Sequence, residues 1–418
     1  MIKWKHVMNN LKVGVFHPGT QHSWQTALAF QETKQLQWYL TSVFYDANTG
    51  VGRLINKLPN PIKDRLVNEL KRRSFSQLDT NFVHVDGLWE WGEVFAARLG
   101  FRTLAAKLDE IGNRRIFKKV NSLIENKEVD VIWGYNNSSL ESFKIAKQFG
   151  VICVLDQTIG HPKSYNSIIE REQSQFSRYF LSATSPLHST QRILRNDEEV
   201  ALADLVIVGS KFCAQTMIEN GCAASKIRVV PYGYDESIFS KPKILSINEN
   251  APVQFLFVGS VIPRKGIHYL LEAFKDISIE QAKLTIVGGL GVPQKILKEY
   301  ESNVTFIPSL PRSSMPEYYN KADVFIFPSL FEGGGIVLYE ACSAGLAIIQ
   351  SKMCGDGVGD NNGIVLEDVN TSNIKQAVDF FIKNKGMVLE MKEKSINHSK
   401  KRKWSNYRQG IRDVLNGF

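Results

Sequence analysis

The chain has 418 residues, of which 43% are hydrophobic and 22% are charged, so it is long enough for two or three globular domains. It contains no run of about 18 apolar residues that would span a membrane, and its first residues lack the pattern of a secretory signal. The five cysteines are odd in number and form no CxxC pair, which argues against a disulfide framework and a cysteine-built zinc site. We therefore expect a protein of the reducing cytoplasm.

The formal net charge is +9, and the excess of lysine and arginine inclines toward the N-terminal half. Such a modest excess suits an anionic partner, such as a nucleotide diphosphate or an acidic lipid surface. It is too diffuse to predict nucleic-acid binding, and no nucleic-acid-binding motif accompanies it.

The N-terminal half alternates short apolar runs with helical segments. The predicted strands are 12–16, 38–44, 129–134, 151–156, 204–210 and 227–231. The predicted helices include 23–35, 62–73, 93–110 and 138–149. The stretch 232–252 mixes turn residues with polar ones and is the predicted junction between two domains.

Two loops of this half follow predicted strands. In the loop 16–22, Gly19 would let a ligand approach the backbone closely, and His17 and Thr20 flank it. The loop 155–162 contains Asp156. His22 is interpreted as structural, because a lone histidine more often has a structural role than a catalytic one.

The stretch 51–73 is basic and amphipathic, with apolar residues on one face and lysines and arginines on its flanks. Two interpretations stay open. It is either a helix that touches an anionic membrane or an ordinary surface helix beside an acceptor site.

The C-terminal half alternates more regularly. Its predicted strands are 255–260, 283–289, 304–308, 323–329, 346–351 and 363–366. Its predicted helices include 266–277, 293–301, 313–321 and 335–344. The sequence therefore predicts an α/β protein with two successive doubly wound parallel sheets. Such sheets bind ligands at the carboxyl ends of their strands, so we expect a site in the cleft between the two domains.

A glycine-bounded turn carries two cations after the first of these strands. It runs from Gly259 to Gly266 and contains Arg264 and Lys265, which can clamp a diphosphate and neutralise its charge. Taken alone, the same residues would be read as a solvated basic turn.

A second glycine-rich segment follows the strand 323–329 and opens a helix. Between Glu332 and Glu340 stand three glycines, 333–335, which let a ligand approach the backbone closely. The helix start offers free N–H groups and a positive dipole end to a phosphate. Glu332 can accept hydrogen bonds from sugar hydroxyls, and Glu340 can reach a ribose diol. The alternative is a glycine-rich turn with a solvated glutamate.

The order of these motifs resembles the retaining glycosyltransferases of family 4 (glycosyl transferases group 1), which have the GT-B fold. The resemblance rests on the E-x7-E motif of FEGGGIVLYEACSAG and on the segments 229–235, 256–274, 284–289 and 318–345. It covers nearly all of the C-terminal half, whereas the N-terminal half matches loosely. It implies two Rossmann-like domains: an acceptor-binding domain, 1–235, and a donor-binding domain, 236–399. The segment 400–418 would form a helix that packs back on the first domain.

The resemblance also assigns roles to single residues. It implies that Ser309 and Leu310 hold the nucleotide base and that His161 lies near the transferred sugar. The predicted catalytic residues are Glu332, His161, Lys265 and Arg264. The predicted donor-binding residues are Gly19, Gly259, Arg264, Lys265, Ser309, Leu310, Glu332, Gly333, Gly334, Gly335, Ile336, Val337 and Glu340. The predicted acceptor-side residues are His17, Gly19, Thr20 and Asp156.

The implied reaction is transfer of a hexosyl unit, with retention, from a nucleoside diphosphate sugar to a hydroxyl. The donor is a UDP- or GDP-sugar, and the acceptor is a sugar, for instance a lipid-linked one in polysaccharide or glycolipid assembly. No cofactor or metal is expected, because no DxD pair stands in a metal-binding loop. The expected location is the cytoplasm, including the inner face of the cell membrane.

One segment departs from the family pattern. The family shows Gly-Gly-x-x-Glu after the strand 346–351, but residues 352–360 read KMCGDGVGD, which puts donor contacts from this loop in doubt. Two rival functions stay open. A GT-B-fold sugar-nucleotide epimerase would bind the same donor without an acceptor, and a non-catalytic protein would only bind the nucleotide sugar.

Overall fold

The computed structural model describes residues 11–416, with gaps at 20, 43, 47–52, 54, 58, 61–62, 64–73, 86–114, 182–183 and 240–246. The predicted helix 93–110 and the candidate residue Thr20 lie outside the described residues, as does most of the amphipathic stretch 51–73.

The first sheet has seven strands in the order β3-β2-β1-β4-β5-β6-β7. The strands are β1 (Val13–His17), β2 (Leu36–Thr41), β3 (Val83–Val85), β4 (Val131–Tyr135), β5 (Ile152–Gln157), β6 (Leu205–Val208) and β7 (Ile227–Val229). The pairs β1–β2, β1–β4, β2–β3 and β4–β5 are parallel. The helices along this part of the chain are α2 (Ser23–Glu32), α7 (Leu140–Gln148), α8 (Pro162–Phe176), α9 (Thr190–Leu202) and α10 (Lys211–Glu219).

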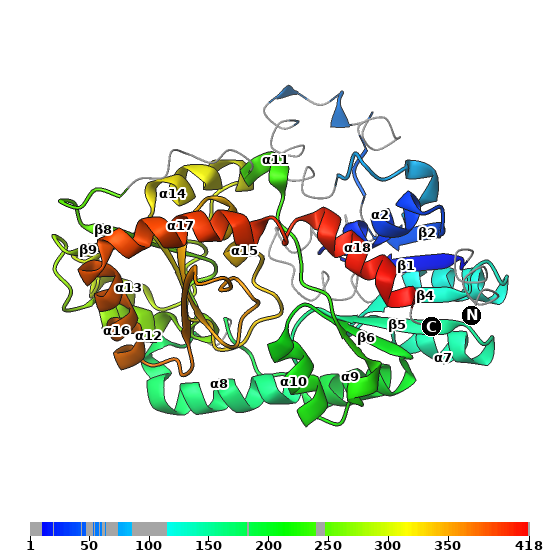
Figure 1. Ribbon diagram of the computed structural model, residues 1–418. Helices are drawn as coiled ribbons and strands as arrows, with labels where there is room; N and C mark the ends of the chain where they lie inside the picture. The colour runs from blue at the N-terminus through cyan, green and yellow to red at the C-terminus, as the bar shows by residue number, and fades with distance from the viewer. Residues whose placement is uncertain are drawn as a thin grey trace. The chain divides into compact units, whose positions relative to one another are not determined.

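The second sheet has six strands in the order β10-β9-β8-β11-β12-β13, and every pair in it is parallel. The strands are β8 (Val253–Val258), β9 (Ala282–Val287), β10 (Val304–Ile307), β11 (Val324–Phe327), β12 (Ala347–Ser351) and β13 (Gly363–Leu366). The helices are α12 (Ile267–Phe274), α13 (Gln294–Lys298), α14 (Met315–Lys321), α15 (Ile336–Ser343), α16 (Thr371–Lys383) and α17 (Lys385–Ser399). Figure 1 shows α12, α13 and α16 on one face of this sheet and α14, α15 and α17 on the other.

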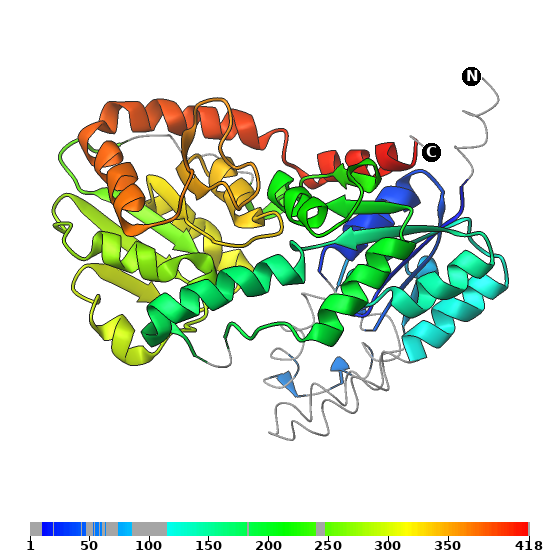
Figure 2. The ribbon, with the colours of Figure 1, turned by 90° about the horizontal axis from the view of Figure 1, so that it is seen from below.

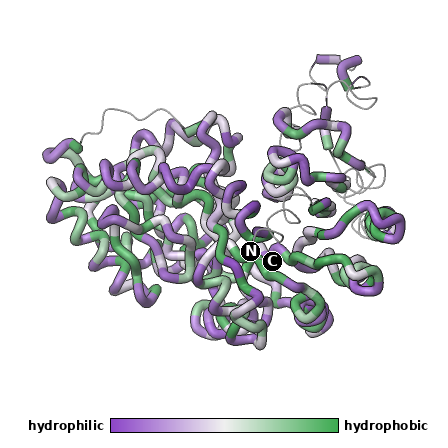
Figure 3. Tube along the Cα trace, turned by 45° about the vertical axis from the view of Figure 1, so that its right-hand side comes forward, coloured by the Kyte–Doolittle hydropathy of each residue, from purple (hydrophilic) through white to green (hydrophobic). Residues whose placement is uncertain are grey.

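Burial explains why the strands read as unbroken apolar runs. All four residues of β11 are buried, because helices cover both faces of the sheet. In Figure 3 the hydrophobic stretches of the trace run through the interior of this half, and hydrophilic stretches lie on its outer turns. The predicted fold class, two doubly wound parallel sheets, is confirmed. The sequence reading did not name α8, whose start is set by Pro162 at its first position.

By their packing, the residues group into two compact units that do not follow the linear order of the chain. One unit holds 1–156, 195–206 and 408–418, and the other holds 157–194 and 207–407. In the second unit, α8 packs on α12, because buried Glu172 accepts hydrogen bonds from His268 (3.0 Å) and Tyr269 (2.9 Å); both helices are seen in Figure 2. The predicted domain limits at 235 and 399 stay a prediction.

The last helix, α18 (Trp404–Leu415), ends in the first unit. There, Arg408 and Arg412 form ion pairs with Glu32 of α2 at 2.7 and 2.5 Å. These contacts join the end of the chain to α2.

A buried carboxyl in the first unit makes its stability depend on pH. Glu199 is fully buried and accepts the N–H groups of Asn137, Ser139 and Leu140 at the start of α7, at 2.7, 2.9 and 3.2 Å. Burial raises the pKa of Glu199 to about 7. A carboxyl whose pKa is higher in the folded state contributes its full stability below the unfolded pKa, and that contribution is lost as the pH rises through about 7.

We therefore expect Glu199→Gln, which cannot ionise, to be less harmful at pH 8 than at pH 5, by up to about 3 kcal/mol. Denaturant unfolding of both proteins at the two pH values measures this difference. A difference in unfolding free energy that does not change with pH would contradict the prediction.

Candidate functional site

The basic turn follows β8, and its conformation depends on glycine. Gly259 ends the strand, and the short 3-10 helix η5 (Pro263–Lys265) places Arg264 and Lys265 before α12. Gly266 has a φ of 68°, and a Cβ there would lie 2.0 Å from the carbonyl oxygen of Pro328. The turn lies directly against Pro328, in the segment that follows β11, and only glycine therefore fits at position 266.

The glycine-rich loop follows β11, the neighbour of β8 in the sheet, and leads into α15. Gly335 has a φ of 65°, and Ile336 and Val337 are the first residues of the helix. A Cβ on Gly333 would lie 2.0 Å from the carbonyl oxygen of Thr158, and one on Gly334 would lie 2.5 Å from the ring of Tyr232. The loop therefore has no room for side chains on its inner side.

Glu332 joins the two loops. Its Oε1 atom accepts from Arg264 Nη1 at 2.7 Å and from Lys265 Nζ, and Arg264 Nη1 also donates to the carbonyl of Phe331 at 2.6 Å. Glu332 and Lys265 are both buried, each with 9% of its surface exposed. The structure thus brings three of the four predicted catalytic residues together at the carboxyl ends of β8 and β11.

The charges of this cluster are coupled. Burial by itself would raise the pKa of Glu332, but the charges of Lys265 and Arg264 outweigh it and hold that pKa below its usual range. Burial lowers the pKa of Lys265, and Glu332 opposes this effect. With the carboxylate ionised and both cations charged, the cluster carries one net positive charge, which suits a phosphate.

Glu340 is buried on α15 and already has two partners. Tyr319 of α14 donates to its Oε2 atom at 3.0 Å, and Arg312 forms an ion pair with its Oε1 atom. Burial raises the pKa of Glu340, and Arg312 opposes this effect. Sequence reasoning missed Arg312, although it comes only two residues after Leu310. The predicted base-binding residue Ser309 is exposed, just beyond β10.

His161 has a structural role as the N-cap of α8. Its Nδ1 atom accepts the backbone N–H of Lys163 at 3.2 Å, and the backbone N–H of His161 donates to Thr216 Oγ1 at 3.0 Å. An imidazole that accepts at Nδ1 carries its proton at Nε2 when it is neutral. His161 therefore caps the helix, and its role near a sugar stays a prediction.

Residues from the middle of the chain pack against the glycine-rich loop. Cys213, near the start of α10, lies with its Sγ atom 3.3 Å from the carbonyl oxygens of Glu332 and Gly333. The ring of Phe331 packs edge-on against Tyr165 and Phe212. Sequence reasoning did not find these contacts, because nothing local marks a buried cysteine as a support for a loop some 120 residues away.

A fixed loop of this kind should not accept a methyl group. We expect Gly333→Ala to destabilise the fold by about 1–3 kcal/mol, because the backbone must move away from Thr158. Gly386→Ala in α17 is the matched control, since a Cβ there meets nothing within 4 Å. Thermal unfolding of both variants checks this; equal stability would contradict the role of Gly333.

In the first unit, three of the N-terminal candidates gather at the carboxyl ends of β1 and β5. His22 Nε2 lies 3.2 Å from Asp156 Oδ2, and both residues are buried. His17 and His22 each contact the ring of Tyr135, at centroid distances of 4.7 and 5.6 Å. Burial lowers the pKa of His17 to about 4, so its ring is neutral at physiological pH. Gly19 lies against that ring.

Among the described residues, no group of three or more histidine, cysteine or acidic side chains is arranged to hold a metal ion. Within the same residues, no helix is both long and apolar enough to cross a membrane.

Residues 238–402 match the family described as glycosyl transferases group 1, which confirms the resemblance for this part of the chain. An uncharacterized glycosyltransferase of Methanocaldococcus jannaschii is 26% identical over 51% of this chain and 59% of its own length. The UDP-Gal:alpha-D-GlcNAc-diphosphoundecaprenol alpha-1,3-galactosyltransferase of Escherichia coli is 26% identical over 61% of this chain and 66% of its own. The alignments therefore span less than two thirds of either relative.

Among solved structures, Anabaena HepE in complex with UDP-glucose has a TM-score of 0.61 and 16% identity, and the alignment covers 98% of this chain and 100% of that one. At this identity the likeness concerns the fold alone. Together with the two parallel sheets, it shows that the chain has the GT-B fold.

Proposed function

We propose, from the premise that residues 238–402 are a glycosyl transferases group 1 region, that this chain is a retaining, metal-independent glycosyltransferase of family 4. It moves a hexosyl unit from a nucleoside diphosphate sugar to an acceptor hydroxyl. The observation that carries the proposal is the buried cluster of Arg264, Lys265 and Glu332, which lies beside the glycine-rich start of α15.

The cluster supplies what transfer from a diphosphate requires. Arg264 and Lys265 neutralise the charge that grows on the leaving diphosphate, and the free N–H groups at the start of α15 add hydrogen bonds. Glu332 then positions the sugar through its hydroxyls. Glu340, fixed by Arg312 and Tyr319, accepts from the ribose diol. The backbone near Ser309 and Leu310 holds the base, and Gly259 leaves room for the phosphates.

Binding of the donor involves an exchange of partners. Without a donor, the two cations hold the carboxylate of Glu332. A diphosphate competes for the same cations, and Glu332 is thereby released toward the sugar. The leaving phosphate takes the proton of the acceptor hydroxyl, so that the reaction needs no protein general base, in contrast to hydrolysis by paired carboxylates.

The names of two relatives indicate which substrates to test. One is named for UDP-galactose and a diphosphoundecaprenol-linked acceptor, and a Staphylococcus aureus relative for capsular polysaccharide biosynthesis. We therefore favour a UDP-sugar donor and a lipid-linked sugar acceptor, bound on the side of His17, Gly19, Thr20 and Asp156. Such an acceptor places the protein in the cytoplasm at the inner membrane face, with contact through 51–73.

The proposal is tested by incubating the protein with UDP-glucose, UDP-galactose or GDP-mannose and a panel of sugar and lipid-linked acceptors. Release of nucleoside diphosphate only in the presence of an acceptor, and a product with the anomeric configuration of the donor, are expected. Conversion of the donor without an acceptor would instead show an epimerase, and binding without turnover would show a non-catalytic protein.

A further inference from the structure

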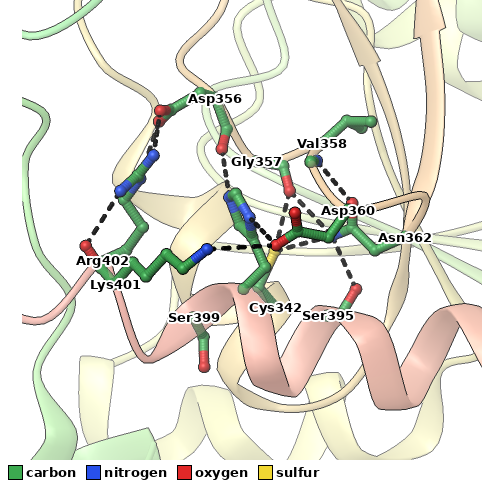
Figure 4. Close-up of polar contacts among 12 residues, drawn as sticks. Cys342, Asp356, Gly357, Val358, Asp360, Asn362, Ser395, Ser399, Lys401 and Arg402 are labelled. Atoms are coloured by element: carbon green, nitrogen blue, oxygen red, sulfur yellow. Dashed lines mark hydrogen bonds and ion pairs between the residues drawn. The ribbon is translucent and has the colours of Figure 1, made fainter.

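The segment 352–360, which departs from the family pattern, is part of a loop, 352–362, with a defined conformation. The side chain of Gln350 donates to the carbonyl of Gly355 at 2.5 Å and accepts the N–H of Val358 at 2.8 Å. Asn362 accepts the N–H of Gly359 at 2.7 Å and donates to Ser395 of α17 at 3.0 Å. The loop is therefore held by Gln350 of β12 and by Ser395 of α17; Figure 4 shows the contact between Asn362 and Ser395.

This loop lies directly on the glycine-rich loop. A Cβ on Gly355 would stand 2.0 Å from the carbonyl oxygen of Gly334 and 2.8 Å from the hydroxyl of Tyr339. The neighbouring Cys354 is buried. Backbone lies against backbone with no side chain between, so a displacement of Gly355 toward Gly334 must displace Gly334, and a displacement away from it removes a packing contact.

Asp356, the next residue, fixes the loop through its carboxylate. Its Oδ1 atom accepts from Tyr339 at 2.8 Å and from Arg402 Nε at 3.0 Å, and its Oδ2 atom accepts from Arg402 Nη2. The two-pronged contact with Arg402 is seen in Figure 4. Burial raises the pKa of Tyr339 well above its usual range, so its hydroxyl stays a donor.

The partners of Asp356 are themselves anchored. Tyr339 precedes Glu340 on α15, so the contact fixes the helix that carries a predicted donor ligand. Arg402 accepts the N–H of Tyr234 at its carbonyl (3.0 Å), and His398 Nε2 donates to the carbonyl of Asp356 at 2.7 Å. The partly exposed ion pair between Asp356 and Arg402 contributes little to stability by itself. Here it belongs to a hydrogen-bond network whose other members are fixed by their own contacts.

We propose that Asp356 is a positioning residue for the donor site, an inference that rests on the proposed function. Together with Arg402 it presses Gly355 against Gly334 and holds Tyr339. The N–H groups at the start of α15 are thereby fixed where a nucleoside diphosphate binds. The loop 352–362 stands in the place where the family has its Gly-Gly-x-x-Glu segment. In this chain it packs against the glycine-rich loop and so supports the backbone N–H groups that would bind the phosphate.

The test compares Asp356→Asn with the wild type in titrations with UDP, GDP and ADP. We expect Asp356→Asn to raise the dissociation constant of the nucleotide that binds by about tenfold, and the KM of the matching sugar nucleotide likewise, with the acceptor KM unchanged. Arg402→Gln should have the same effect, and the double variant should bind no more weakly than either single one.

Asp360→Asn is the matched control, because Asp360 is an exposed acid of the same loop whose contacts with His398 and Lys401 are 3.7 and 3.6 Å long. It should bind as the wild type does. A lower melting temperature of Asp356→Asn with unchanged nucleotide affinity would show a merely structural role and overturn the inference. If Asp356→Asn does not fold, Tyr339→Phe removes one hydroxyl; it should weaken binding, and unchanged binding overturns the inference equally.

These titrations distinguish a failure of the proposed function from a failure of the inference about Asp356. If the wild type binds none of the three nucleotides, the proposed function falls, and this inference with it. If the wild type binds one of them and Asp356→Asn binds it equally well, only the inference falls.

Discussion

Replacement of Lys265 by methionine is expected to lower the rate of glycosyl transfer about 100-fold or more, since it removes a cation from the leaving diphosphate. Methionine retains the apolar stem, which packs where Nζ lies 4.7 Å from the centroid of the Phe327 ring. The fold should therefore persist, and the loss should appear in kcat as well as in donor affinity.

The control for this variant is Lys275→Met, which removes an exposed cation at the end of α12. Steady-state kinetics and thermal unfolding of both variants separate the loss of chemistry from the loss of structure. Full activity of Lys265→Met would remove this residue from the proposed site.

Glu332→Gln is expected to act in opposite directions on binding and on catalysis. Because the carboxylate competes with the diphosphate for Arg264 and Lys265, its removal should tighten binding of the free nucleoside diphosphate about tenfold. Transfer should nevertheless slow by about 100-fold or more, because the residue that orients the sugar is lost.

Calorimetric titration with the nucleoside diphosphate and a transfer assay measure the two effects on one preparation. Glu367→Gln is the control, since this exposed glutamate is 3.5 Å from Lys352 and far from the cluster in sequence. Weaker binding of the diphosphate to Glu332→Gln would refute the exchange of partners, and an unchanged rate would refute the role of Glu332 toward the sugar.

Much of the donor side could be predicted because its determinants are local. Alternating apolar strands and helical segments indicated a parallel sheet, and in such a sheet loops that follow adjacent strands meet at one edge. The convergence of Arg264, Lys265 and Glu332 follows from that rule. The left-handed conformation of Gly266 and Gly335 explains why glycine stands there.

The supports of these loops could not be predicted, because they depend on contacts between distant segments. Thr158 lies before α8 and Cys213 lies on α10, yet both contact the glycine-rich loop. The irregular segment 352–360 put donor contacts from this part of the chain in doubt, but nothing in its residues indicated that Asp356 would pair with Arg402. The acceptor side was left open because the N-terminal half matches the family only loosely, and Thr20 and most of 51–73 lie outside the described residues.

The central claim, that the Arg264–Lys265–Glu332 cluster binds the diphosphate of a sugar nucleotide, is tested most directly by thermal shift with UDP-, GDP- and ADP-sugars. Donor present at 100 times its dissociation constant stabilises a protein by about 2.7 kcal/mol. We expect one nucleotide class to raise the melting temperature of the wild type and to leave that of Lys265→Met nearly unchanged. No shift with any donor, or equal shifts in both proteins, would contradict the claim.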